Sequence, residues 1–217
     1  MVLLISAVSC KKKDNTIIYG YHYFPVDEGH YVIYDVLDVF HDSALIPAHD
    51  TSRYQIKEVI GEAFIDEVGD TARKLRRYIR DNDTLSWTIK DVWSIKRSSK
   101  RAEEVEENQR RIKMAFAISY DEQWDGNALN NDDPETYYYR NIYKPVSIAG
   151  IDYDSSVVVE HHDFTSYIEY IRSYDIYAPH IGKIYSVNKN LQIAEYDTLN
   201  IHYGSEFTYS AVSWGTE

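Results

Sequence analysis

The sequence predicts an all-β protein, a single antiparallel sheet that curves into a partial barrel and leaves room for one short helix. Three observations carry this prediction. Apolar and polar residues alternate with a period of two over many segments. Turn-forming residues separate those segments. Tyrosine, which suits half-buried strands, is the compositional outlier, with 21 residues among 217.

The expected strands follow one another along most of the chain. Residues 30–40 form a β-branched and aromatic run, and residues 53–65 form a second strand, with Gly61 as an expected bulge. Within residues 85–95 the alternation places Trp87 and Trp93 on one face, together with Leu85, Ile89 and Ile95. The other expected strands are 112–118, 137–143, 155–160, 167–177, 181–187 and 206–214.

Two segments, 70–81 and 100–113, are rich in helix-forming residues, and their Glu–Lys/Arg spacing suits a helix. Their apolar residues lie two apart near the ends, so the strand interpretation is preferred for both. Turns are expected at 81–83, 124–127, 130–134 and 149–150. With no internal repeat and no second boundary, residues 17–217 are expected to form one β domain.

The first residues differ in character from the rest. Residues 1–9 are mostly apolar or small and end at Cys10, the single cysteine, and Lys11-Lys12-Lys13 follows. This pattern resembles a bacterial lipoprotein signal. Residues 1–9 would then be a signal peptide, Cys10 the lipidated N-terminus, and residues 10–16 a polar tether. Because no basic residue precedes the apolar run, we expect the natural start to lie upstream of Met1. The alternative is a short buried strand over 2–8 with an inert cysteine.

The charge distribution limits the partners. A net charge of -12 argues against nucleic acid as a partner. Basic residues gather between Arg73 and Lys113, which suggests either an anionic partner or pairing across neighbouring strands. The pairing interpretation is preferred, because the acidic cluster Glu103, Glu104, Glu106 and Glu107 lies within the same stretch.

No catalytic constellation stands out, and neither an enzyme activity nor a cofactor is expected. The sequence has no nucleophile elbow and no phosphate-binding glycine loop. Among eight histidines the densest group is His161-His162-Asp163, but adjacent strand residues point to opposite faces, so zinc is not expected. A weak calcium candidate is the oxygen-rich loop with Asp125, Asn127, Asp132 and Asp133, which lacks EF-hand spacing.

Asp-Ser or Asp-Thr followed by a small or aliphatic residue occurs four times. The motif resembles the O-glycosylation acceptor of exported proteins in Bacteroidota-type bacteria. The candidate acceptors are Ser43, Thr71, Thr84 and Thr198. The alternative is that Asp-Ser and Asp-Thr simply favour turns at strand ends.

Longer motifs resemble one group of uncharacterised Bacteroidota envelope lipoproteins. They are residues 23–26 with 29–34, 86–97, 105–108, 124–130 and 177–185. The last motif departs from the group's usual pattern, since His180 replaces a glycine and Ile181 a valine. The resemblance implies secretion, a lipid anchor in the outer membrane (palmitate is a typical acyl chain) and an antiparallel β fold. It implies no activity.

These observations favour a non-catalytic envelope lipoprotein, periplasmic or surface-facing, that binds or carries a ligand. A rolled sheet lined by Trp87, Trp93, Tyr31 and Ile33 could enclose an apolar ligand, although an ordinary core explains those residues as well. The first alternative is a structural or interaction subunit of a surface complex, with an envelope protein as its partner. A hydrolase is the second alternative and would need convergent polar residues in a cleft.

Overall fold

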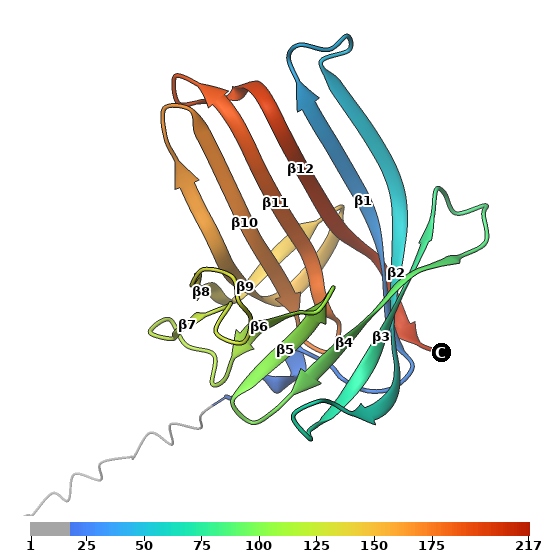
Figure 1. The fold of residues 1–217 in the computed structure, drawn as a ribbon. Helices are drawn as coiled ribbons and strands as arrows, with labels where there is room; N and C mark the ends of the chain where they lie inside the picture. The colour runs from blue at the N-terminus through green and yellow to red at the C-terminus, as the bar shows by residue number, and fades with distance from the viewer. Residues whose placement is uncertain (1–17) are drawn as a thin grey trace, which may run out of the picture.

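The computed structural model describes residues 18–217, which form twelve antiparallel strands in one strongly curved sheet (Figure 1). The predicted signal peptide, Cys10 and the tether lie outside the described residues. The strands are β1 (His30–Asp42), β2 (His49–Ile65), β3 (Thr71–Arg80), β4 (Thr88–Arg97), β5 (Arg101–Glu106), β6 (Gln109–Ala115), β7 (Gln123–Asp125), β8 (Thr136–Ile148), β9 (Ile151–Thr165), β10 (Glu169–Ala178), β11 (Gly182–Ala194) and β12 (Asp197–Thr216).

The strand order is β6-β5-β4-β3-β2-β1-β12-β11-β10-β9-β8-β7. Consecutive strands are neighbours in this order except β6 and β7, which stand at its two ends, and the first and last strands, β1 and β12, pair in the middle. The two ends of this order meet. The amide of Ile112 in β6 donates to the carbonyl oxygen of Gly126 at 2.9 Å, and the indole of Trp124 in β7 donates to the carbonyl oxygen of Ile112 at 2.9 Å. The sheet is therefore a nearly closed barrel, which confirms the predicted all-β class.

The two ambiguous segments are strands, as preferred. Residues 70–81 contain β3, and residues 100–113 contain β5 and most of β6, which ends at Ala115 within the expected strand 112–118. The turn residues Glu107 and Asn108 of this β5–β6 hairpin have φ of 48° and 68°, a two-residue turn of the type that suits tightly twisted hairpins. The expected bulge at Gly61 is confirmed by a register shift between Ile60 and Ala63.

The predicted apolar face of residues 85–95 is only partly correct. Trp93 and Ile95 belong to the core, whereas Leu85 and Ile89 are exposed. The register with β3 shifts between Ile89 and Asp91, so one extra residue in β4 changes which side chains face inward.

Tyr31 and Ile33 do not line the interior as proposed. In β1 the buried residues are Val32, Tyr34 and Val36. In this run the residues that point to one face of the strand and those that point to the other are both largely apolar. The sequence pattern alone therefore does not show which face is buried.

One end of the barrel is closed by residues 20–25, which include the short 3₁₀ helix η1 (Tyr21–Tyr23) (Figure 1). The hydroxyl groups of Tyr23 and Ser155 lie 2.6 Å apart, and Arg97 donates to the carbonyl oxygens of Tyr21 and Phe24 at 2.8 and 2.7 Å. This helix fits the expectation of one short helix. Within residues 18–217, no helix has the length and apolarity to cross a membrane.

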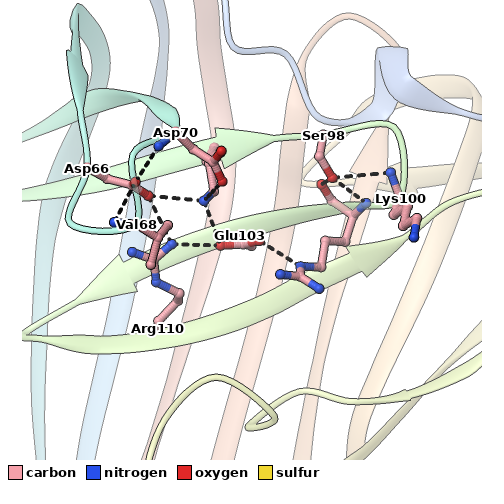
Figure 2. A network of polar contacts seen from close by, with 9 residues as sticks. Asp66, Val68, Asp70, Ser98, Lys100, Glu103 and Arg110 are labelled. Atoms are coloured by element: carbon pink, nitrogen blue, oxygen red, sulfur yellow. Dashed lines mark hydrogen bonds and ion pairs between the residues drawn. The ribbon is translucent and has the colours of Figure 1, made fainter.

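Cross-strand ion pairs cover the outside of β4–β6 (Figure 2). Glu103 contacts Arg101 at 2.6 Å, Arg110 at 2.9 Å and Lys96 at 3.5 Å. Asp66 joins the network through Lys96 at 3.0 Å and accepts hydrogen bonds from the amides of Val68 and Asp70. The basic stretch between Arg73 and Lys113 therefore pairs with acidic residues of neighbouring strands, as preferred from the sequence.

Candidate ligand-binding cavity

The barrel holds a polar cavity of about 330 Å³, within the size range of small-molecule sites. It is lined from β3 to β6 and from β8 to β12. The lining includes Asn188 and Asn190, which are exposed, so the cavity opens to solvent along β11. Most of the remaining lining is charged or aromatic: Arg77, Trp93, Glu104, Glu106, Arg111, Lys113, Glu135, Tyr137, His161, His162, Asp175, Lys183, Phe207 and Tyr209.

Strand alternation explains how an acidic run supplies both the outer surface and the cavity. Successive side chains of a strand point to opposite faces. Glu103 therefore joins the outer ion-pair network, while its neighbour Glu104 lines the cavity. Of the acidic cluster noted in the sequence, Glu103 alone fulfils the predicted pairing role, and Glu104 has a different environment.

Two of the interior cations are firmly paired. Lys113 lies 2.9 Å from a carboxylate oxygen of Asp175, which also accepts a hydrogen bond from the hydroxyl group of Tyr177 at 3.1 Å. Arg77 lies 3.0 Å from Glu58, and its guanidinium stacks 3.6 Å from the ring centre of Trp93. These pairs compensate charges that burial would otherwise make very costly.

The pKa values of the Lys113–Asp175 pair move apart. Burial raises the pKa of Asp175, but the cations Lys113, His161 and Lys183 outweigh it and hold that pKa far below its ordinary value. Burial lowers the pKa of Lys113, but Asp175 and Glu104 outweigh it and raise that pKa. Both groups are therefore charged at neutral pH.

Lys183 and Glu104 differ from these pairs. Among the described residues, no carboxylate lies within 4.0 Å of the ammonium of Lys183, and no basic group within 4.0 Å of the carboxylate of Glu104. The ammonium lies 5.8 and 5.9 Å from the ring centres of Tyr34 and Tyr209. Burial lowers the pKa of Lys183, but Glu58 and Glu104 act from a greater distance and raise it well above its ordinary value.

Glu104 is 8% exposed, and its pKa is raised above its ordinary value. Burial raises this pKa, and Lys183 and Lys113 oppose the shift without cancelling it. Glu104 and Lys183 also line a second, largely apolar pocket of about 60 Å³ with Phe24, Val32, Ile60, Leu75 and Ile95. The two groups therefore stand at the junction between the polar cavity and a small apolar recess.

His161 lies in the same interior, stacked on Tyr137 with ring centres 4.2 Å apart. Its Nδ1 lies 3.2 Å from the hydroxyl oxygen of Ser173, and its Nε2 lies 3.5 Å from Asp175. Burial lowers the pKa of His161 to about 3, against the opposing effect of Asp175. The neighbouring His162 lines the same cavity and lies 3.3 Å from Glu135. The register with β10 shifts at His161, so strand alternation does not hold there, and the expectation that the two histidines point to opposite faces is wrong.

The candidate calcium residues hold a loop together. Asp125 accepts hydrogen bonds from the amides of Asn127 and Glu135, each at 2.9 Å. The side-chain amide of Asn127 donates to the carbonyl oxygen of Asp133 at 2.8 Å, and Asp132 pairs with Arg111 at 3.4 Å. Within the described residues, no three His, Cys, Asp or Glu side chains gather as metal ligands would.

The candidate glycosylation sites lie at the surface. Ser43, Thr71 and Thr84 are exposed, and Thr198 is partly exposed. The aspartates before Ser43 and Thr198 accept hydrogen bonds from the amides of Ala44 and Leu199, each at 2.9 Å, as turn-forming aspartates do. Their modification stays a prediction.

The sequence interpretation missed the cavity residues Lys183, Glu104 and Asp175. The sequence carries a signal for two of them, since Asp175 lies next to buried Ile176, and Lys183 lies between buried Gly182 and Ile184. Such isolated charges occur as often on solvated faces. Only the closure of the sheet brings β5, β6, β10 and β11 around one space.

No protein-family model and no curated protein sequence matches the chain. Two solved structures align with most of this chain. One, from Bacteroides fragilis, is a protein inferred to be exported, with a YmcC-like fold. It is 10% identical, the match covers 89% of this chain and 98% of that chain, and the TM-score is 0.45. The other is a domain assigned to outer-membrane lipoprotein sorting, from Vibrio parahaemolyticus. It is 9% identical, covering 88% of this chain and 87% of that chain, with a TM-score of 0.21.

Proposed function

We propose that the protein is an exported, envelope-associated binding protein that holds a small polar ligand in its barrel and performs no chemistry on it. The observation that carries this proposal is the 330 Å³ cavity with the unpaired groups Lys183 and Glu104 on its wall. Interior charges without partners are costly, and a protein keeps them at little benefit to its own stability. A ligand that satisfies them gives them a use.

The ligand class differs from the apolar one considered from the sequence. An apolar molecule in this cavity would remove Lys183, Glu104 and Asp175 from water without replacing the lost hydrogen bonds, which costs free energy. A polar molecule can donate to the carboxylates and accept from the ammonium. The aromatic lining, Trp93 and Tyr137, already stacks on Arg77 and His161 and is less free to receive an apolar ring.

Binding rather than catalysis is favoured by the direction of the pKa shifts. A general acid or base works best with a pKa near the ambient pH. The pKa of Lys183 and of Lys113 is raised, that of Asp175 lowered, and that of His161 lowered to about 3, so each moves away from neutrality. The pKa of the Glu104 carboxyl group is raised instead. A lone carboxyl group without a nucleophile beside it is a weak basis for hydrolysis.

The proposal is tested by native mass spectrometry of the protein extracted without detergent exchange from the envelope of its own host. We expect a species heavier than the denatured chain by a small polar molecule, which unfolding releases. A double variant, Lys183→Met with Glu104→Gln, should emerge without that mass. If the parent protein carries no releasable small molecule, the binding proposal is wrong and the interaction-subunit alternative becomes the better one.

A further inference from the structure

We propose that the ligand of this cavity is an organic anion, whose carboxylate or phosphate group binds the ammonium of Lys183. The inference rests on the proposed function, and it names the ligand class. It follows from a comparison of the four cations that line the cavity: Arg77, Arg111, Lys113 and Lys183.

Three of the four cations have a carboxylate partner of their own. Arg77 pairs with Glu58 at 3.0 Å, Lys113 with Asp175 at 2.9 Å and Arg111 with Asp132 at 3.4 Å. Among the described residues, Lys183 is the lining cation with no carboxylate within 4.0 Å. It therefore offers three donors and a full positive charge to whatever enters the cavity.

The nearby carboxylates cannot easily satisfy Lys183 from within. Glu58 is engaged by Arg77, and Asp175 is engaged by Lys113 and Tyr177. Glu104 faces the same space, and it lies in a strand held on both sides, by β4 and β6. An incoming anion would complete the pairing of Lys183, with its other polar groups within reach of Glu104 and the serine and asparagine side chains of the lining.

Both protonation states of Glu104 lead to the same requirement. If its carboxyl group is neutral, Glu104 offers Lys183 no opposite charge, and a ligand anion supplies one at the ammonium. If it is ionised, Lys183 still has no direct partner, and the ligand anion binds there with a donor group turned toward Glu104. The anionic group is therefore the invariant part of the ligand, whereas a second, cationic group is optional.

The test uses the full chain expressed in its own host as parent, Lys183→Met and Lys183→Arg, with Lys90→Met as a matched lysine on the outside of the barrel. The compound released on unfolding is identified by mass spectrometry and electrophoresis. We expect an anion whose occupancy falls at least tenfold in Lys183→Met, recovers in Lys183→Arg and is unchanged in Lys90→Met. A carboxylate and a phosphate are told apart by their masses and by phosphate release with a phosphatase.

The outcomes separate the two proposals. A neutral or cationic released compound, or an anion that Lys183→Met retains, overturns the anion inference and leaves the binding function standing. If unfolding releases no compound at all, both the anion inference and the binding function are overturned. As an independent measurement, the unloaded parent protein is titrated with glucose, gluconate and glucose 6-phosphate, which share a polar body and differ in charge. Equal binding of neutral glucose and the two anions would also contradict the inference.

Discussion

At the scale of single residues, the interior of this barrel places paired and unpaired charges side by side. Lys113 and Lys183 are both lysines on the wall of one cavity, yet only Lys113 has a carboxylate at ion-pair distance. Lys113 neutralises Asp175 in the folded protein, whereas the role proposed for Lys183 is to bind a ligand. Stability measurements can separate these roles without knowledge of the ligand.

Replacing Lys113 by methionine should destabilise the protein strongly. The substitution leaves the carboxylate of Asp175, which is 2% exposed, without its nearest cation. Breaking a buried pair from one side costs about 3–5 kcal/mol of the free energy of unfolding, measured by urea denaturation. Lys90→Met removes an exposed partner of Asp91 and should change that free energy by less than about 1 kcal/mol. Equal effects of the two changes would contradict the assigned role of Lys113.

His161 predicts a pH dependence with a definite sign. In the folded protein its pKa is lowered to about 3, while the unfolded chain binds a proton near pH 6.5. The contribution to stability is therefore complete above about pH 6.5 and is lost as the pH falls. Between pH 6 and pH 4, the parent should lose about 1.4 kcal/mol per pH unit relative to His161→Gln. Denaturation curves at each pH measure this, and parallel stability profiles would refute it.

At the scale of elements, three hairpins use two-residue turns with positive φ at both positions: Glu107-Asn108, Ala149-Gly150 and Glu195-Tyr196. This backbone suits Asn and Gly, and Glu is a poor choice for it. Glu107→Asn should therefore raise the free energy of unfolding by about 0.5–1 kcal/mol, measured by thermal and urea denaturation. The same change at Glu67, an exposed turn residue without positive φ, should give no gain.

The elements also show how far sequence patterns reach. Strands with a clear alternation, such as 137–143 and 206–214, were found, although each extends further than its pattern. The pattern over 100–113 does not reveal the hairpin β5–β6, because Glu107 is an unusual first residue for a two-residue turn and no glycine marks it. The three-residue strand β7 was missed, since its length is set by contacts with β6 and β8 rather than by its own residues. Register shifts, which decided which side of β4 faces inward, have no sequence signature of comparable strength.

At the scale of the whole molecule, the cavity exists because the sheet closes on itself, and closure depends on few contacts. The strand order ends at β6 and β7, which are joined by the hydrogen bond from Ile112 to Gly126 and by the indole of Trp124. The sequence could suggest a rolled sheet, but it could not show which edges meet. The unpaired state of Lys183 likewise depends on strands far from it in the sequence, since the nearby charged groups stand on β2, β5, β6 and β10.

Gly126 is the position at which closure can be tested. A Cβ atom there would lie 2.4 Å from the ring of Tyr137, a cavity residue that is 2% exposed. Gly126→Ala should therefore lower the free energy of unfolding by about 1–3 kcal/mol and speed hydrogen exchange of the Ile112 amide at the junction. Gly61→Ala is the matched control, since a Cβ atom there meets only the end of the flexible Arg76 side chain and should cost less.

If the junction between β6 and β7 opens in Gly126→Ala, ligand occupancy should fall together with the protection of the Ile112 amide, because Tyr137 contacts this junction and also lines the cavity. Normal occupancy with a lost Ile112 hydrogen bond would show that the cavity does not depend on closure between β6 and β7.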